Sequence, residues 1–327
     1  MEVENRAELC FPQFPNTSCR KPSPPWPQTV TIMLYSISPI TVTLNLLIII
    51  SISHFRQLHT PTNFLLLSLA VSDLLVGLVL MPVEVLRKTS CWFLGEFVCS
   101  TFTLLSVNIP SASIGDIVLI SVDRYVAICD PLHYTTKVTG RRVKFCVCLC
   151  WLCAVSYSLH FVKDLPSQTD VHKYCYGECR LNTDIASLFF DLLVTFIVPV
   201  TAIIALYLRI FAVAVSQARA MRSHITAVTL QHSVTPKAKK SELKAARKLG
   251  VLVLVFLICF CPYFVIGWVD FDWVRTVIGQ FILFLYFFNS CLNPVIYAFL
   301  YPWFRKAVKL IVTLQILQPG SSETNML

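Results

Sequence analysis

Seven apolar runs, each about long enough to cross a bilayer, constrain this chain more than any other feature. About 20 apolar residues of helix cross a hydrocarbon core about 30 Å thick. Hydrophobic residues make up 56% of the 327 residues and charged residues 14%, which is unusual for a soluble protein. The fourth run is shorter than the others and rich in cysteine. The sequence predicts an all-α membrane protein, a seven-transmembrane helix bundle, with runs near 31–55, 64–86, 97–128, 145–162, 185–214, 249–269 and 274–300.

Lysine and arginine set the orientation. If the N-terminus is outside, the inner segments carry about twice as many Lys and Arg as the outer ones, as the positive-inside rule requires. The net charge of +9 then describes a basic cytoplasmic face and does not indicate nucleic-acid binding. We predict a multi-pass plasma-membrane protein with an extracellular segment 1–29, a membrane domain 30–301 and a cytoplasmic segment 302–327. The first 30 residues lack the order of a cleaved signal, so the first span would be an uncleaved anchor.

The cysteines fit this topology. Six would lie outside, where disulfides persist, and their 15 possible pairings stay open on the residues alone. A cysteine group at 146–153 resembles a metal cluster, but alternation along an apolar helix favours packed thiols. Asn16 begins a glycosylation sequon in the outer segment. The six outer cysteines are Cys10, Cys19, Cys91, Cys99, Cys175 and Cys179.

Polar residues in the middle of a span need a reason to be there. Asn45 is best explained as a hydrogen-bonding link between helices. Asp73 is a carboxylate with hydroxyl and amide residues on other spans and no evident basic partner. Oxygen-rich surroundings of this kind suit a small hard cation.

A charge latch with hinged helices is the second polar feature. Arg124, in Asp123-Arg124-Tyr125, is either a snorkelling side chain at a helix end or a latch to an acid on another helix. Glu242, one acid among many basic residues, is the candidate partner. Prolines kink helices five, six and seven, and kinked helices can pivot. Together these features suggest a receptor with two states; the three prolines are Pro199, Pro262 and Pro294.

Several motifs resemble those of rhodopsin-like G-protein-coupled receptors, over essentially the whole chain. They are LAVSD (69–73), DRYVAICDPLHY (123–134), FLICFCP (256–262) and NPVIY (293–297). NSCLNPVIYAFLYPWF (289–304), CYGEC (175–179) and the N-terminal LC…NTSC resemble the trace amine-associated receptors. Olfactory receptors proper share something like the Asp123-Arg124-Tyr125 segment but usually lack the YPWF ending. The resemblance implies a seven-helix bundle followed by a short amphipathic cytoplasmic helix.

The resemblance also implies roles for residues away from the ligand pocket. An allosteric sodium ion, the one cofactor implied, would be held by Asp73, Ser113, Asn289 and Asn293. Disulfides would join Cys99 to Cys179 and Cys19 to Cys175, with Cys10 the less favoured partner of Cys175 and none assigned to Cys91. G-protein coupling and switching would fall to Asp123, Arg124, Tyr125, Tyr207, Glu242, Tyr297, Ile114, Pro199 and Phe256.

The sequence departs from the aminergic pattern inside the pocket. Aminergic receptors hold the ligand ammonium with an Asp on helix three, and that position here is Ser106. The helix-seven tyrosine that bonds this Asp is Phe287, and the helix-six switch, usually Trp, is Phe260. Pro110 on helix three is a further departure.

Asp191, in SLFFDLLVTFIVP (187–199), offers a replacement anchor. It lies eight residues before Pro199, about 12 Å outward along helix five. The resemblance implies that the charge has moved there from helix three, as in a teleost-type branch that binds the amine reversed. The alternative is a protonated carboxyl, or a structural bond to a neighbouring helix. Asp116 is the better candidate for a structural bond, to a Ser or backbone group in helices three to five.

The remaining pocket residues follow from the same comparison. Ser106 would add a hydrogen bond, and aromatic rings would surround the ammonium. Glu84 would hold a second ammonium if the ligand is a diamine, although a solvated position at the rim is the simpler interpretation. The predicted aromatic wall is Phe260, Tyr263, Phe264 and Phe287.

The leading hypothesis is a receptor, not an enzyme, that senses a small mono- or diamine, with olfaction as its role. Its partners would be a heterotrimeric G protein of the stimulatory type, arrestin and receptor kinases. A non-olfactory biogenic amine receptor is the alternative, and the missing helix-three Asp argues against it. A transporter would need an inverted repeat and a path of charged residues through the membrane, and the sequence shows neither. Helix seven has no Lys for retinal, and no catalytic set converges in the spans.

Overall fold

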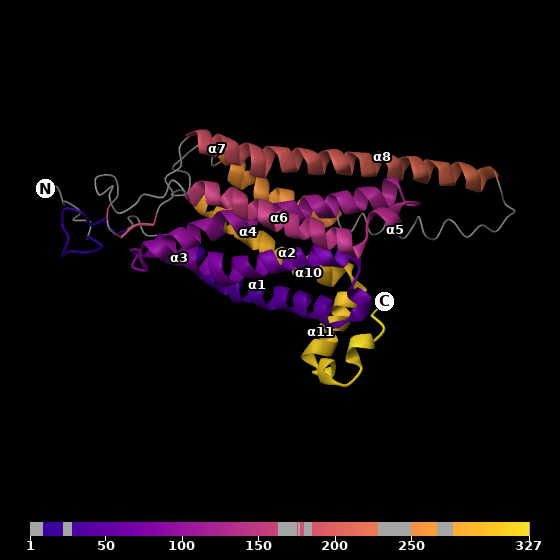
Figure 1. Ribbon diagram of the computed structural model, residues 1–327, viewed down its shortest axis with the longest axis horizontal. Coiled ribbons are helices and arrows are strands. Elements are labelled where there is room, and N and C mark those ends of the chain that lie inside the picture. Colours follow the sequence, from indigo (N-terminus) through magenta and orange to yellow (C-terminus); the bar gives the residue numbers. More distant parts are fainter. Residues whose placement is uncertain are drawn as a thin grey trace.

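A computed structural model describes residues 9–21, 28–162, 175, 177–179, 185–227, 250–266 and 277–326. In this part of the chain nearly all regular structure is helical, and the long helices run side by side along the long axis of the molecule (Figure 1). Six of them are long and apolar enough to cross a membrane, and the helix Gly250–Ile266 is a shorter apolar one. The predicted seven-helix class is therefore confirmed.

The helices agree with the seven predicted runs, usually within a few residues. The weakest run, at 145–162, is a full span that begins earlier, at Gly140. The fifth helix continues well beyond residue 214, because helix propensity and not hydropathy decides where a helix ends. In order, the spans are α1 (Gln28–His54), α2 to α3 (Pro61–Thr89), α4 (Gly95–Cys129), α6 (Gly140–Val162), α7 to α8 (Ile185–Ala227), Gly250–Ile266 and α10 (Val277–Leu300).

Helix α4 lies at the centre of the bundle, where it packs against α2, α6 and α8. Its close contact with α6 depends on Gly115. A Cβ at that position would lie 2.3 Å from Cys150 Sγ, so a larger residue would force the helices apart. Cys148 and Cys153 of the cysteine group are exposed, so the prediction of packed thiols fits only part of that group. The group points in several directions, as its alternation predicted.

Two spans contain a π-helical turn just before a proline. Helix α2 (Pro61–Leu75) passes through the turn Val76–Leu80 into α3 (Met81–Thr89), which carries Pro82. Helix α7 (Ile185–Asp191) passes through the turn Leu192–Ile197 into α8 (Val198–Ala227), which carries Pro199. Proline lacks an N–H and its ring crowds the carbonyl of residue i−4, so the preceding turn widens. Both turns lie in segments that carry candidate pocket residues.

Cytoplasmic helix α11 (Pro302–Val312) follows α10, as the resemblance implied. Beyond it the chain folds back against the end of α1. Glu323 pairs with Arg56 at 3.3 Å, and the Met326 N–H donates to Gln57 Oε1 at 2.8 Å. The Met326 side chain is 2% exposed and joins the core cluster that includes Trp303. This docked tail extends the hydrophobic core below α11, which the sequence did not predict.

Candidate functional site

Asp191 lies at the junction of α7 and the π-helical turn, half-buried at the outer part of the bundle. The Tyr157 hydroxyl of α6 donates to its Oδ1 at 2.5 Å, and the Thr195 hydroxyl lies 3.3 Å from the same atom. The Tyr157 bond is of the kind that the sequence offered as the alternative to a ligand anchor, a structural bond to a neighbouring helix. Both neighbours are neutral, however, so among the described residues the charge of Asp191 meets hydroxyl groups and not a counter-ion.

Aromatic rings line the helices that face Asp191. Tyr263 stacks on Tyr286 with ring centroids 4.5 Å apart, and Phe196 stacks on Phe264 at 4.9 Å. Phe260 contacts Phe264 at 5.1 Å and is buried. Tyr263 and Tyr286 pack against the same core cluster as Leu192 and Phe196, which follow Asp191 in the fifth span, so rings from helices six and seven lie near that span. The predicted ring residues are thus brought together, with Phe287 buried at 5.4 Å from Tyr286.

Ser106 does not point freely into a cavity. Its hydroxyl donates to the Thr103 carbonyl of its own helix at 2.8 Å and its side chain is half-buried. The hydroxyl can still accept a hydrogen bond, because donating leaves its lone pairs available. Ser106 therefore stays a candidate for a polar contact, without the charge that an aspartate would provide.

Glu84 differs from the expected solvated rim residue. It is 6% exposed, and Arg87 forms a two-pronged ion pair with it, Nε to Oε2 at 2.8 Å and Nη2 to Oε1 at 2.7 Å. The same guanidinium donates through Nη1 to the Cys179 carbonyl at 3.2 Å. The rim interpretation was wrong because the i,i+3 spacing brings Arg87 over Glu84, whose carboxylate is buried while the arginine side chain stays 25% exposed.

Two residues of helix seven contact the buried carboxylate of Asp73. The Asn293 amide donates to Asp73 Oδ2 at 2.7 Å, and the Ser290 hydroxyl lies beside the same carboxylate. Asp73 Oδ1, Asn289 Oδ1 and Asn293 Oδ1 are buried without a hydrogen-bond donor among the described residues. Ser113 is buried as well. Such orphaned oxygens with one full negative charge fit a small hard cation.

Asp116 is buried on α4 near Asp73 but has a different neighbour. Its Oδ2 accepts a hydrogen bond from Ser68 at 2.7 Å, and Trp151 Nε1 donates to the same serine oxygen at 3.0 Å. The predicted structural role fits this geometry. The predicted location of the partner was wrong, because Ser68 belongs to helix two. Asn45 links spans one and seven as expected, by donating to the Ser290 carbonyl at 3.1 Å.

At the cytoplasmic end, Arg124 pairs, among the described residues, with Asp123 of its own helix and with no acid from another helix. Its Nη2 also donates to the Thr62 hydroxyl at 2.7 Å, and the Tyr134 hydroxyl donates to Asp123 Oδ1 at 2.8 Å. Burial and then the Asp123 carboxylate raise the pKa of Tyr134 to about 12, so this phenol stays protonated. Glu242, the predicted partner, lies outside the described residues.

The switch residues form a continuous column between this latch and the aromatic rings. Ile114 and Phe256 are buried in one core cluster, and Phe256 stacks on Phe260 at 4.8 Å. Tyr207 and Tyr297 carry buried hydroxyls without a hydrogen-bond partner among the described residues. Arg124 is close enough to Tyr207 to interact with it electrostatically. These two hydroxyls are available for new bonds if the helices move.

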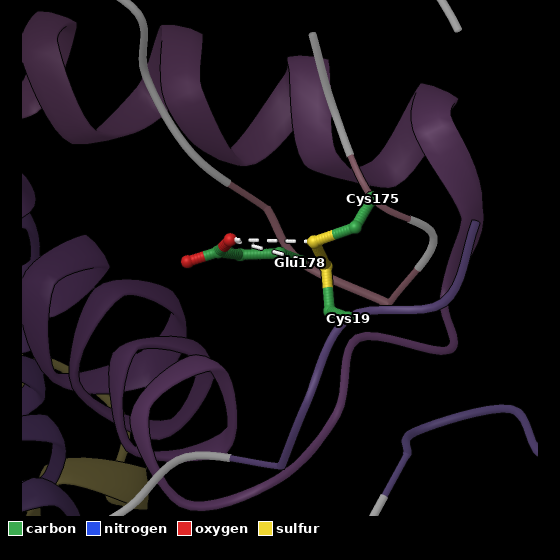
Figure 2. A group of neighbouring side chains, drawn as sticks. All are labelled: Cys19, Cys175 and Glu178. Atoms are coloured by element: carbon green, nitrogen blue, oxygen red, sulfur yellow. Dashed lines mark hydrogen bonds between the residues drawn. A yellow bond between two sulfur atoms is a disulfide. The ribbon is translucent and has the colours of Figure 1, made fainter. Parts of the chain in front are cut away.

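Three disulfides tie the extracellular segments together. Cys99–Cys179 and Cys19–Cys175 are present as implied, and Cys10 pairs with Cys91 with Cα atoms 5.6 Å apart. The sequence had left the last pair open. Figure 2 shows Glu178 beside the Cys19–Cys175 bridge, with Oε2 3.9 Å from Cys19 Sγ. These sulfurs are oxidised and carry no proton, so the group is neither a hydrogen bond nor a thiolate metal site.

Sequence reasoning missed four residues that the structure adds to these sites. The i,i+3 spacing after Glu84 was a readable signal for Arg87. Tyr157 and Tyr286 have no such signal, because each meets its partners only through the packing of separate helices. Tyr134 belongs to the quoted arginine motif, and its role needed the short helix α5 (Tyr134–Lys137) that turns it back toward Asp123.

Comparison with known proteins places the chain in a family. Residues 44–297 match the 7 transmembrane receptor (rhodopsin family). Trace amine-associated receptor 7e of Mus musculus is 37% identical over 332 aligned positions, which cover 98% of this chain and 92% of the mouse protein. Trace amine-associated receptor 13c of Danio rerio is 38% identical and covers 98% and 96%. The chain therefore belongs to the rhodopsin family of seven-transmembrane receptors and, within it, to the trace amine-associated receptors.

Proposed function

We propose that this receptor senses a small amine whose ammonium group pairs with Asp191. The observation that supports this most directly is a partly desolvated carboxylate whose close contacts in the described chain are two neutral hydroxyls. Hydroxyl donors orient a carboxylate but leave its charge unbalanced. A cationic ligand would complete the site.

The aromatic residues support the same ligand class. A cation near the face of a ring gains about 0.5–2 kcal/mol, depending on how far it is desolvated. Tyr263 and Tyr286 of helices six and seven pack against the core cluster that Leu192, the residue after Asp191, joins from the fifth span. We propose that these rings and Phe264 enclose the amine, while Ser106 contributes at most a neutral polar contact.

The relatives support amine sensing through the name that they share, trace amine-associated receptors. We further propose an olfactory role and coupling to a stimulatory G protein, which rest on this kinship and not on the geometry of the pocket. The pairing of Arg124 with Asp123 fits a resting state, and release of that arginine would expose it to the G protein.

We also propose that a sodium ion binds at Asp73. The oxygens that would hold it belong to Asp73, Asn289, Asn293 and Ser113. The ion would supply positive charge beneath the ligand pocket and stabilise one arrangement of helices two, three and seven.

The exchange Asp191→Asn tests the ligand anchor. Asparagine keeps an oxygen for the Tyr157 hydroxyl but removes the charge, so it separates an ion pair from a structural bond. Losing one partner of a desolvated ion pair costs about 2–5 kcal/mol, so amine potency should fall by orders of magnitude. The measurement is a cAMP reporter dose–response over a panel of amines, with surface expression followed in parallel.

Tyr157→Phe is the matched control, because it keeps the charge and removes the hydroxyl. A neutral hydrogen bond contributes about 1 kcal/mol, so potency should change about tenfold or less. If Asp191→Asn responds like the wild type and Tyr157→Phe does not, Asp191 is a structural residue and the proposed anchor is wrong.

A further inference from the structure

Glu84 and Arg87 form a buried charge pair at the outer end of the second span, on α3. The guanidinium occupies both carboxylate oxygens, at 2.8 and 2.7 Å. Its third contact, to the Cys179 carbonyl at 3.2 Å, fastens it to the second extracellular loop. Cys179 is itself bonded to Cys99 at the start of α4, so the arginine is held from two sides.

This pair lies beside the proposed amine pocket. Tyr263 of helix six and Tyr286 of helix seven pack against the apolar cluster that contains Val85, the residue after Glu84. Both tyrosines also pack against the core cluster that Leu192, the residue after Asp191, joins from the fifth span. The two rings stack at 4.5 Å, so one aromatic pair meets the segments that carry the two carboxylates.

The two carboxylates differ in what an arriving cation would meet. Asp191 offers a negative charge whose contacts among the described residues are two neutral hydroxyl groups. Glu84 offers a charge already neutralised by a guanidinium that matches its geometry. An ammonium could form a full ion pair with Glu84 only by displacing Arg87, which would then lose its carboxylate partner.

We propose that Arg87 makes the pocket selective for monoamines, because it occupies the carboxylate that would otherwise bind the far ammonium of a diamine. This inference rests on the proposed anchoring of an amine by Asp191. Arg87 is therefore a specificity-determining residue that acts through Glu84. Without it, the pocket would present two negative charges, Glu84 and Asp191, near the same aromatic pair.

Glu178 is the other acid near this arginine, and it belongs to the entrance. Its side chain is exposed, on the loop that carries the Cys19–Cys175 bridge (Figure 2). Water and salt screen an exposed carboxylate, so it attracts monoamines and diamines with little selectivity.

The test compares matched ligands on four receptors. The probes are hexylamine with hexane-1,6-diamine, and phenethylamine with 4-(2-aminoethyl)benzylamine. The receptors are the wild type, Arg87→Gln, the double variant Glu84→Gln with Arg87→Gln, and Lys88→Gln as a control that removes a neighbouring positive charge. The readout is the ratio of diamine to monoamine potency, with surface expression measured for each.

We expect the wild type to favour the monoamine of each pair. Arg87→Gln should raise the diamine to monoamine ratio about tenfold or more, because it frees one desolvated carboxylate. The double variant and Lys88→Gln should keep the wild-type ratio. The double variant buries no lone charge, so it stays informative if Arg87→Gln fails to reach the surface.

Two outcomes would overturn the inference alone. One is a surface-expressed Arg87→Gln receptor with an unchanged ratio. The other is a wild type that prefers diamines and loses this preference in the double variant, which would make Glu84 a ligand site despite Arg87. Silence of the wild type toward every amine would instead remove the proposed function, and the inference with it.

Discussion

The carboxylates inside the helix bundle differ in what faces them. Glu84 meets a guanidinium, Asp191 meets two hydroxyls, and Asp116 meets one serine. Asp73 meets an amide donor and a group of oxygens that lack donors. A buried carboxylate is costly unless something offsets its charge. The unbalanced ones are therefore the positions where a ligand or an ion would bind.

Asp73 and Asp116 make a matched pair for testing the sodium site. We expect sodium to shift amine potency in the wild type by about fivefold or more, as coupled sites typically do. Asp73→Asn should abolish this dependence because it removes the one full charge among the site oxygens. Asp116→Asn keeps the acceptor for Ser68 and should leave the dependence intact. The measurement is nucleotide exchange in membranes, with sodium replaced by equal potassium.

Equal loss of sodium dependence in both variants would point to a general effect of buried charge and against a site at Asp73. Unchanged dependence in Asp73→Asn would remove the site altogether. Because Asp116→Asn eliminates a buried charge without a counter-ion among its contacts, the variant should be at least as thermostable as the wild type.

Which residue roles could be predicted from the sequence depended in part on how far apart along the chain the partners lie. The role of a polar residue in an apolar span was accessible, such as Asn45 as a hydrogen-bonding link between helices. The pairing of Arg124 with Asp123 was not predicted, because the sequence favoured an acid on another helix. The contact between Tyr157 and Asp191 was not, because the residues are 34 apart and meet only when α6 packs beside the fifth span. Local spacing predicts i,i+3 and i,i+4 contacts, whereas contacts between helices depend on rotations that hydropathy leaves undetermined.

At the scale of elements, hydropathy predicted the spans well and their irregularities poorly. Six of the predicted runs correspond to long apolar helices and the other to the shorter helix Gly250–Ile266. The π-helical turns Val76–Leu80 and Leu192–Ile197 had no hydropathy signal. Pro199 predicted a kink near the second turn, and no kink was predicted at Pro82 near the first. A kink and an extra residue in a turn also rotate the preceding side chains differently.

Pro199 is therefore expected to set the direction of Asp191. In Pro199→Ala the chain regains an N–H and can close a regular α-helical turn, which rotates the preceding segment by up to about 100°. Asp191 should then leave the Tyr157 hydroxyl, and amine potency should fall by about tenfold, or 1.4 kcal/mol. Dose–response curves with measured surface expression test this.

Pro39→Ala is the control for this exchange, because Pro39 also lies inside a membrane helix but is exposed and belongs to α1, not to the fifth span that carries Asp191. We expect it to keep wild-type potency. A Pro199→Ala receptor with wild-type potency would show that the widened turn persists without proline and that packing alone sets the direction of Asp191.

At the scale of the whole molecule, the two ends of the chain are fastened to opposite ends of the bundle. On the cytoplasmic side the docked tail covers the core beside Trp303. On the extracellular side Cys10 bonds to Cys91 and Cys19 to Cys175, and the Cys10 N–H donates to the Cys19 carbonyl at 2.8 Å. The N-terminal segment and the first two outer loops thus form one linked layer. The cysteine count alone had left the pairing of these disulfides open.

Gly177 shows how tightly this layer is packed. Its φ of +109° suits glycine, and a Cβ there would lie 2.8 Å from the Cys10 Cβ. Its carbonyl accepts from the Trp92 N–H at 2.9 Å, next to Cys91. The Cys10–Cys91 bridge therefore joins segments that this backbone hydrogen bond already holds close together.

Removing that bridge should destabilise the receptor without removing its response. Because the other two disulfides already restrict the same loops, replacing Cys10 and Cys91 together by Ser should cost about 2 kcal/mol, the low end for a native disulfide. The melting temperature of the purified receptor should fall, while Asp191 and its neighbours keep amine potency nearly unchanged. Cys148→Ser, at an exposed free thiol, is the control. Peptide mapping without reduction should join Cys10 to Cys91, and a map that joins Cys91 to Cys19, or leaves Cys91 reduced, would contradict this arrangement of the extracellular layer.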